Sequence, residues 1–275
     1  MSGSVFYNYP IWVWGVFLIA MMIVFVMTTL FCVQKWILSR PCLQTKTIPS
    51  SSIISAISST YAMLIALLVF SVLNTFLDVN RNVQAEASST GDLFRDSRGL
   101  PQDLRNEIQT HLIRYLDLVI EVEWPKQRQG YLGDTKIPGW DELDKINDIL
   151  STYNAPTLST SVIQAELFHR LNAIYDFRRA RVFASQKAVP SVVWEIIVTG
   201  AVVFLLFTSL LAAENFNIKV LQTVLVFTSI TLVIMLIIAL DRPFQGQLRI
   251  DSGEFKIVRQ NIQHLVEVDG GPRSG

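Results

Sequence analysis

Four long stretches almost without charge constrain this chain more than any other feature. Residues 5–33, 48–77 and 220–240 contain no Asp, Glu, Lys or Arg, and residues 188–213 contain only Glu195. A helix needs about 20 apolar residues to cross about 30 Å of hydrocarbon, so each stretch is long enough to span a membrane. The chain is 51% hydrophobic and only 17% charged. The sequence therefore predicts an all-α integral membrane protein with four transmembrane helices.

The spans divide the chain into segments. The first span is not expected to be a cleaved signal, because no basic segment precedes it and its apolar run is too long. The predicted spans are residues 11–33, 53–77, 192–211 and 220–240. The predicted segments are membrane helices 1 and 2 (1–77), a helical insert (78–187), membrane helices 3 and 4 (188–241) and a short, partly polar tail (242–275).

The insert is predicted to be helical throughout. The second span becomes polar in "DVNRNVQAEASSTGDLFRD" without a Pro, and its first Gly is Gly91, so one helix is expected to continue out of the membrane. Apolar residues then recur at spacings of three and four, which is typical of helices. Trp124-Pro125 is interpreted as a packed aromatic residue followed by a helix stop. The apolar positions are Leu104, Ile108, Leu112, Tyr115, Val119 and Val122, then Trp140, Leu143 and Ile146, then Ile163, Leu167, Leu171 and Ile174.

One face of the second span is small and hydroxylated at its start, apolar in its middle and amide-bearing beyond the membrane. At 100° per residue, its members stay within about 40° of one line. They are Ser55, Ser59, Ala62, Ala66, Leu73, Leu77, Asn80 and Gln84. Two interpretations remain open: close packing of helices through small residues, or a pore lining in a ring of identical subunits. The spacing alone favours packing, and the uncharged stripe says nothing about the sign of an ion.

The fourth span ends abruptly in "IIALDRPFQGQLRI". Asp241 and Arg242 can form an ion pair at the membrane surface, and Pro243 prevents the helix from continuing. Gly246 then lets the chain turn back, which would bring the following "QLRIDSGEF" against the helices of the insert. We expect Asp241, Arg242, Pro243 and Phe244 to form a structural joint.

No pattern in the sequence indicates an enzyme. Phosphate-binding, nucleophile-elbow and zinc-binding motifs are absent from the sequence, and His111, His169 and His264 lie far apart. We therefore predict no catalytic residues, no metal site and no cofactor. The two cysteines, Cys32 and Cys42, are interpreted as free thiols, with a disulfide across the first loop as the alternative.

A basic cluster precedes the third span. Arg178, Arg179 and Arg181 are interpreted as interfacial anchors, and attraction of anions or lipid headgroups is the alternative. Glu195 lies about one turn inside the span, shallow enough to reach water. The chain has a net charge of zero and therefore lacks the excess of basic residues that is typical of nucleic-acid-binding proteins. Basic residues flank the spans on both sides of the membrane, so their distribution does not decide the orientation. We favour a cytoplasmic insert, with both termini on the same side.

Four motifs in the same order resemble the bestrophin-like domain family of mostly bacterial four-span membrane proteins. They are "RNVQAEASSTGDLFRDSRGLP", "YLDLVIEVEWP", "RRARVFASQKAVPSVVW" and "ALDRPFQGQLRI", within residues 60–255. The chain departs from true bestrophins because no acidic calcium-binding run follows the last span. We therefore expect no calcium clasp.

The resemblance implies a homopentameric anion channel in the bacterial inner membrane, surrounded by lipid, with a cytoplasmic helical region. The second membrane helix would line the pore, with Phe70, Leu73 and Leu77 as an apolar constriction, and the expected anions are chloride or bicarbonate. Phe70 lies about 60° off the line but is long enough to lean in. The alternative is a membrane-anchored scaffold or signalling protein whose helical insert binds a partner.

Overall fold

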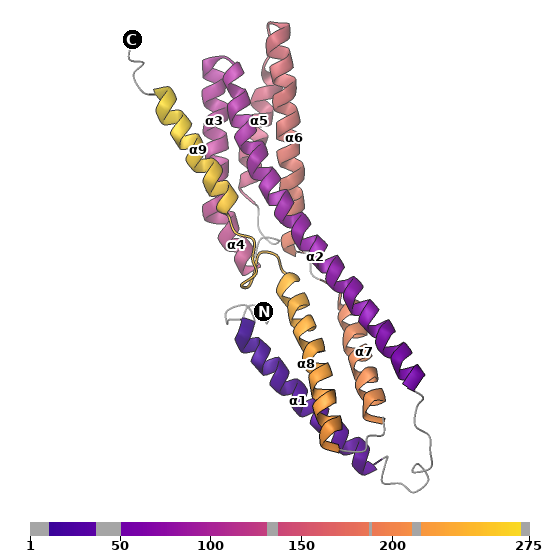
Figure 1. Ribbon diagram of the computed structural model, residues 1–275. Coiled ribbons are helices and arrows are strands. Elements are labelled where there is room, and N and C mark those ends of the chain that lie inside the picture. Colours follow the sequence, from indigo (N-terminus) through magenta and orange to yellow (C-terminus); the bar gives the residue numbers. More distant parts are fainter. Residues whose placement is uncertain (1–10, 37–50, 131–136, 187–188, 211–215, 271–275) are drawn as a thin grey trace. The chain divides into compact units, whose positions relative to one another are not determined.

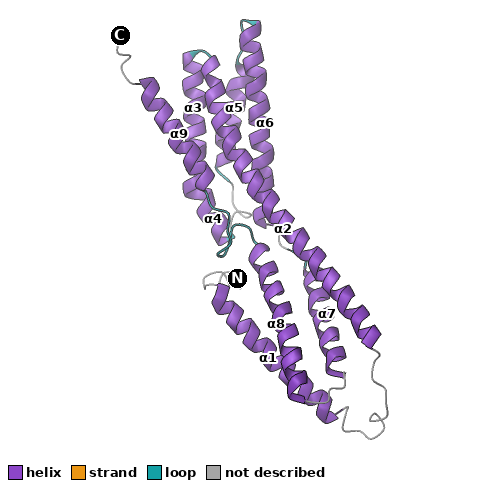
Figure 2. Ribbon diagram, in the orientation of Figure 1, coloured by secondary structure: helices purple, strands orange, loops and turns teal. Residues whose placement is uncertain are grey.

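The computed structural model describes residues 11–36, 51–130, 137–186, 189–210 and 216–270, and every regular element within them is a helix (Figures 1 and 2). The all-α prediction is therefore confirmed for the described residues. In chain order the α-helices are α1 (Ile11–Trp36), α2 (Ser51–Asp96), α3 (Gln102–Leu118), α4 (Trp124–Gln129), α5 (Gly139–Thr152), α6 (Leu158–Gln186), α7 (Ser191–Leu210), α8 (Phe216–Leu240) and α9 (Gly253–Gly270).

The helices belong to two units. The span unit comprises Met1–Thr75 and Ala188–Arg242, and the insert unit comprises Phe76–Lys187 and Pro243–Gly275. Helix α2 contributes its first part to the span unit and its remainder to the insert unit. Its 46 residues form one helix, as predicted from the absence of Pro in this segment. The helix ends in a 3₁₀ turn at Ser97–Gly99, and Leu100 separates this turn from Pro101.

The span unit contains the membrane helices. Helices α1, α2, α7 and α8 are each long and apolar enough to cross a membrane, which confirms the four predicted spans. Their sides that face one another form a small apolar core, while large apolar side chains elsewhere on these helices are exposed, as membrane helices require. The buried core residues are Val26, Leu30, Tyr61, Ile65, Ala201, Phe204, Leu205 and Phe227.

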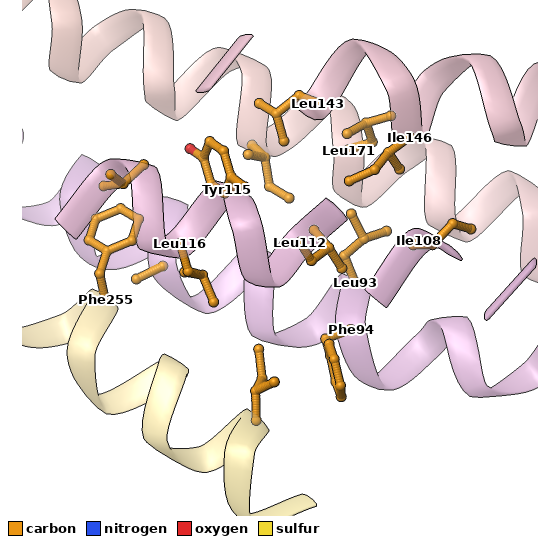
Figure 3. Packing of buried hydrophobic residues seen from close by; sticks show 14 of the residues in the cluster. Leu93, Phe94, Ile108, Leu112, Tyr115, Leu116, Leu143, Ile146, Leu171 and Phe255 are labelled. Carbon is orange, nitrogen blue, oxygen red and sulfur yellow. The ribbon is translucent and has the colours of Figure 1, made fainter. Parts of the chain in front are cut away.

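The insert unit has a larger core, built from α2, α3, α5, α6 and α9. Leu93 from α2, Leu112 from α3 and Ile146 from α5 are fully buried in it. Figure 3 shows Leu171 from α6 and Phe255 from α9 in the same cluster. Burial of such side chains stabilises a fold by about 1.5–3 kcal/mol each. The three- and four-residue spacings in the insert therefore mark the sides of helices that pack together.

The predicted helix stop at Trp124-Pro125 is wrong. Trp124 is buried, as expected, but Pro125 occupies the first turn of α4, where its missing N–H costs nothing. A π-helical turn at Val119–Glu123 joins α3 to α4 without leaving the helical path. Helix α4 ends at Gly130, whose positive φ of 76° is the left-handed conformation that ends many helices.

The tail contains a helix that the sequence analysis missed. Helix α9 follows Ser252 and packs Phe255 and Ile262 into the insert core, and Val258 packs against that core. These positions are three and four residues apart, so the signal for a helix was present in the sequence. The tail is thus part of a folded unit and not a polar extension.

Candidate functional site

The stripe on α2 is exposed in the single chain. Among the nine predicted pore-lining residues, Asn80 is partly buried and the others are exposed. The exposed ones are Ser55, Ser59, Ala62, Ala66, Phe70, Leu73, Leu77 and Gln84. No packing of this face against the described part of the same chain is therefore seen, so close packing within one protomer does not explain the small residues.

The other side of α2 holds the helix to its neighbours in the span unit. Tyr61 and Ile65 are buried, and the Tyr61 hydroxyl donates a hydrogen bond to the carbonyl oxygen of Ile197 on α7, at 2.9 Å. The Tyr61 ring lies against Gly200 and is 6.1 Å from the ring of Phe204. These contacts fix the rotation of α2 about its axis. At about 100° per residue, Tyr61 and Ile65 lie about 80–120° around the helix from the stripe, so the stripe is not part of the packed side.

Three bulky apolar side chains follow one another along this face, one helical turn apart. Phe70 is 64% exposed, and Leu73 and Leu77 are each 39% exposed. Large apolar groups normally seek burial or lipid. On one face of a helix that already has a packed side, they form a surface for lipid, for a neighbouring copy or for a narrow dewetting lumen.

The predicted joint after α8 ties two pairs of segments together. Within the span unit, Asp241 Oδ1 accepts a hydrogen bond from the backbone N–H of Val189 at 2.6 Å, which links the end of α8 to the start of α7. Within the insert unit, the carbonyl oxygen of Pro243 accepts from the N–H of Ile250 at 2.8 Å and closes a loop. Gly246 turns this loop with a φ of 78°.

Phe244 attaches the joint to the insert core. Its ring meets Trp124 edge to face with centroids 5.7 Å apart, and Phe255 lies 5.5 Å from Trp124 on the same core. Arg242 is partly buried. The chain therefore turns back against the insert helices as expected. In this joint, the carboxylate of Asp241 accepts a hydrogen bond from a backbone N–H.

Two of the three arginines in the basic cluster before α7 are not interfacial anchors. Arg178 and Arg181 are fully buried inside the insert unit, and only Arg179 is exposed. Arg178 forms a two-pronged pair with Glu123, with Nη2 to Oε1 at 2.6 Å and Nη1 to Oε2 at 3.0 Å. Both earlier interpretations of these two side chains, anchoring and attraction of anions, are wrong, because their charges are satisfied within the fold.

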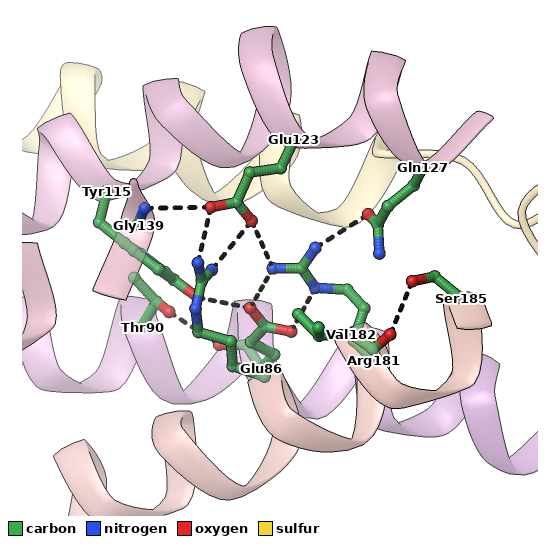
Figure 4. A network of polar contacts seen from close by, with 10 residues as sticks. Glu86, Thr90, Tyr115, Glu123, Gln127, Gly139, Arg181, Val182 and Ser185 are labelled. Carbon is green, nitrogen blue, oxygen red and sulfur yellow. Dashed lines mark hydrogen bonds and ion pairs between the residues drawn. The ribbon is translucent and has the colours of Figure 1, made fainter. Parts of the chain in front are cut away.

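Arg181 joins a second carboxylate to the same network (Figure 4). Its Nε and Nη2 donate to the two oxygens of Glu86 at 2.7 and 2.9 Å, and Nη2 also lies 3.1 Å from Glu123 Oε2. Gln127 Oε1 accepts from Nη1 at 2.9 Å, and the Tyr115 hydroxyl donates to Glu86. Two acids and two bases thus form a buried set with no net charge.

The network shifts the pKa values of Glu123 and Arg181 toward their charged forms. Burial alone would raise the pKa of the Glu123 carboxyl, but Arg181 and Arg178 outweigh burial and hold this pKa below its ordinary value. Burial alone would lower the pKa of Arg181, but Glu86 and Glu123 outweigh it and raise this pKa. The arrangement is that of a structural centre, since no side chain in it faces an open site.

The histidines do not gather into a site in the described part of the chain. His169 and His264 are exposed, and His111 Nδ1 lies 2.6 Å from Glu142 Oε2 between α3 and α5. Glu195 is exposed on α7. Among the described residues, no group of His, Cys, Asp and Glu could hold a metal ion. Cys32 is an exposed free thiol, and Cys42 lies outside the described residues.

These features define the class of the molecule: an all-helical membrane protein with four candidate spans, in which the second membrane helix continues into a helical insert. A family model, the bestrophin-like domain, matches residues 45–255. The chain belongs to the bestrophin-like domain family, as its motifs predicted.

Solved structures agree with this fold. A single-substitution variant of a bacterial bestrophin homologue from Klebsiella pneumoniae is 12% identical, with a TM-score of 0.69, over 94% of this chain and 99% of that chain. A zinc-phased structure of a bacterial bestrophin homologue from Klebsiella pneumoniae is 12% identical, with a TM-score of 0.65, over 91% and 97%. The comparison with curated proteins finds no match. At this identity the structural likeness supports the fold.

Proposed function

We propose that this chain is a homo-oligomeric ion channel of bestrophin type, with α2 lining an axial pore. The observation that carries the proposal is the exposed stripe. Helix α2 is held on one side by Tyr61 and its neighbours, about 80–120° around the helix from the stripe, and the uncharged stripe is left uncovered over the length of a membrane span. Copies around one axis would turn this face inward and bound a common lumen.

The stripe offers the surface that such a lumen needs. Ser55 and Ser59 would line the outer mouth with hydroxyl groups, and Ala62 and Ala66 would leave it wide. Phe70 and Leu73 would then form apolar rings with Leu77, and a narrow apolar ring gates by excluding water. Asn80 and Gln84 would follow on the inner side. Transport through such a path needs no covalent chemistry.

The finer features are part of the same proposal. The family supports five copies, selectivity for anions such as chloride or bicarbonate, and a place in the bacterial inner membrane among lipids. The insert unit and both termini would be cytoplasmic. If all four helices cross the membrane, the N-terminus, the insert and the tail would lie on one side, which supports a common location for them.

The test is a reversal-potential measurement on purified full-length chain in planar bilayers. Across a potassium chloride gradient, an anion channel gives a reversal potential near that of chloride. The mass of the complex in mild detergent is measured on the same sample, and five copies are expected. Absence of current, or a monomer that carries no current, would contradict the proposal.

A membrane-anchored scaffold is the second candidate, and one observation favours it. Leu158 and Val162 are exposed one turn apart at the start of α6 in the insert unit, where a partner could bind. This candidate predicts that a Leu158→Ser and Val162→Ser double variant no longer binds a protein partner that the wild type binds. It also predicts that the wild type carries no current. A conducting wild-type protein would contradict it.

A further inference from the structure

The exposed face of α2 becomes basic in the insert unit. Its exposed residues near one line are Leu77, Arg81, Gln84, Ser88 and Arg95. At about 100° per residue, all lie within about 40° of the line through Leu77. The surface that is apolar at Leu77 therefore continues as a surface with two positive charges.

The two arginines reach into solvent, and each has an acidic partner one turn earlier on the same helix. The side chain of Arg81 is 73% exposed, with Nη1 3.0 Å from Asp78 Oδ1. The side chain of Arg95 is 62% exposed and pairs with Asp92. Asp92 also lies 3.6 Å from Arg170, so its charge is shared between two bases.

On this part of α2, the basic and acidic residues point in different directions around the helix axis. Arg95 lies on the line through Leu77, and Arg81 lies about 40° from that line. Their acidic partners lie further away, Asp92 at about 60° and Asp78 at about 100°. Both acids are displaced to the same flank. Both arginines therefore start closer to the line than the acids that pair with them, and each acid offsets its arginine from one flank.

We propose that Arg81 and Arg95 determine the sign of the ion that the channel conducts. This inference rests on the proposed pore along α2. In a ring of copies, each arginine becomes a belt of positive charge on the inner side of the apolar constriction, and rings of Arg or Lys select anions. The Arg81 belt, about 6 Å along the helix from Leu77, would concentrate dissolved inorganic anions and repel cations at the end of the narrow segment, and the Arg95 belt would do the same about 27 Å from Leu77.

The contribution of exposed charges depends on salt in a known way. The Debye length is about 10 Å at 0.1 M salt and about 3 Å at 1 M, so the belts act strongly only on ions nearby and at moderate salt. Asp78 weakens the field of Arg81. Removing the acid should therefore change selectivity in the opposite direction to removing the base.

The experiment measures the ratio of chloride to potassium permeability for purified full-length variants in planar bilayers. In Arg81→Gln and Arg95→Gln, we expect the ratio to fall by about threefold or more at 0.1 M salt, and by less at 1 M. Asp78→Asn should raise the ratio. Arg81→Lys, which keeps the charge, should leave it near the wild-type value and shows that folding is intact.

The matched control is Arg179→Gln. Arg179 is also exposed and also pairs with an acid three residues earlier, Asp176, at 2.8 Å, but it lies on α6. Its loss should leave the permeability ratio unchanged.

The outcomes separate this inference from the proposed function. A wild type without current contradicts both. A conducting wild type whose ratio is the same in Arg81→Gln, Arg95→Gln and Arg179→Gln overturns the role of the two arginines and leaves the channel in place. A ratio that moves the same way in Asp78→Asn and Arg81→Gln also overturns it.

Discussion

At the scale of single residues, Glu123 shows how a buried, paired carboxylate can be part of the interior of this fold. Its carboxylate accepts hydrogen bonds from Arg178, Arg181 and the backbone N–H of Gly139, the last at 3.1 Å. Removal of one partner from a buried ion pair leaves the other charge uncompensated, which costs about 3–5 kcal/mol. The network therefore makes the arrangement of α2, α3 and α6 sensitive to one residue.

We predict that acid destabilises the insert unit partly through Glu123. Because the folded-state pKa of Glu123 is lowered, the unfolded chain binds its proton more readily, and the stabilisation is present above its ordinary pKa of about 4.5. It is lost as pH falls through the lower folded-state pKa. Glu123→Gln should reduce the apparent melting temperature at pH 7 and flatten its decline below pH 4.5.

Tryptophan fluorescence at a fixed heating rate measures this effect in detergent. Glu121→Gln is the matched control, because Glu121 is two residues away and exposed, and it should behave like the wild type. An equal decline below pH 4.5 in wild type and Glu123→Gln would contradict the role of the carboxylate.

A second residue-scale prediction concerns the apolar constriction. Leu73→Ala and Leu77→Ala remove the bulk of two proposed rings, so single-channel conductance should rise by about twofold or more. Leu64→Ala is the control, since Leu64 is also exposed but lies about 140° from the line through Leu77. Equal conductance in all four proteins would show that these leucines do not narrow the path.

At the scale of elements, the joint after α8 depends on backbone conformation as much as on side chains. Gly246 has a φ of 78°, which a residue with a Cβ adopts at a cost of about 1–2 kcal/mol. We predict that Gly246→Ala lowers the free energy of unfolding by that amount, measured by denaturant titration of the purified protein.

Gly91→Ala is the matched control for this prediction. Gly91 lies within α2, and an added Cβ would meet Val258 Cγ1 at 3.4 Å, which is ordinary contact. Alanine is favoured over glycine inside a helix by about 0.5–1 kcal/mol, so this variant should be at least as stable as the wild type. A loss of stability in Gly91→Ala but not in Gly246→Ala would contradict the account of the joint.

The elements differ in how far the sequence predicts them. The four spans and the continuous α2 follow from apolar length and from the absence of proline, both of which are local. The pairing of Arg181 with Glu86 bridges 95 residues, and no local pattern distinguishes a buried arginine from an interfacial one. Helix α9, which carries Phe255 and Ile262, was not predicted because its few regularly spaced apolar residues lie within a largely polar segment.

The candidate pore face was predicted only in part. Its residues follow from helical periodicity in α2, but periodicity could not tell close packing from a lumen. The contact of Tyr61 with Ile197 decides which side of α2 is held by its own chain, and this contact depends on tertiary structure. The sequence therefore predicted the stripe, and the fold shows that the described part of a single chain leaves it uncovered.

At the scale of the whole molecule, the proposed channel needs several copies around one axis, with the stripe of each copy facing water. Cysteine accessibility tests this most directly. In a background with Cys32→Ser and Cys42→Ser, which removes both cysteines of the chain, Ala66→Cys is treated with a charged, membrane-impermeant thiol reagent during current recording. We predict that the current falls by more than half, while Leu64→Cys is unaffected. Modification that blocks Leu64→Cys and spares Ala66→Cys would contradict the central claim.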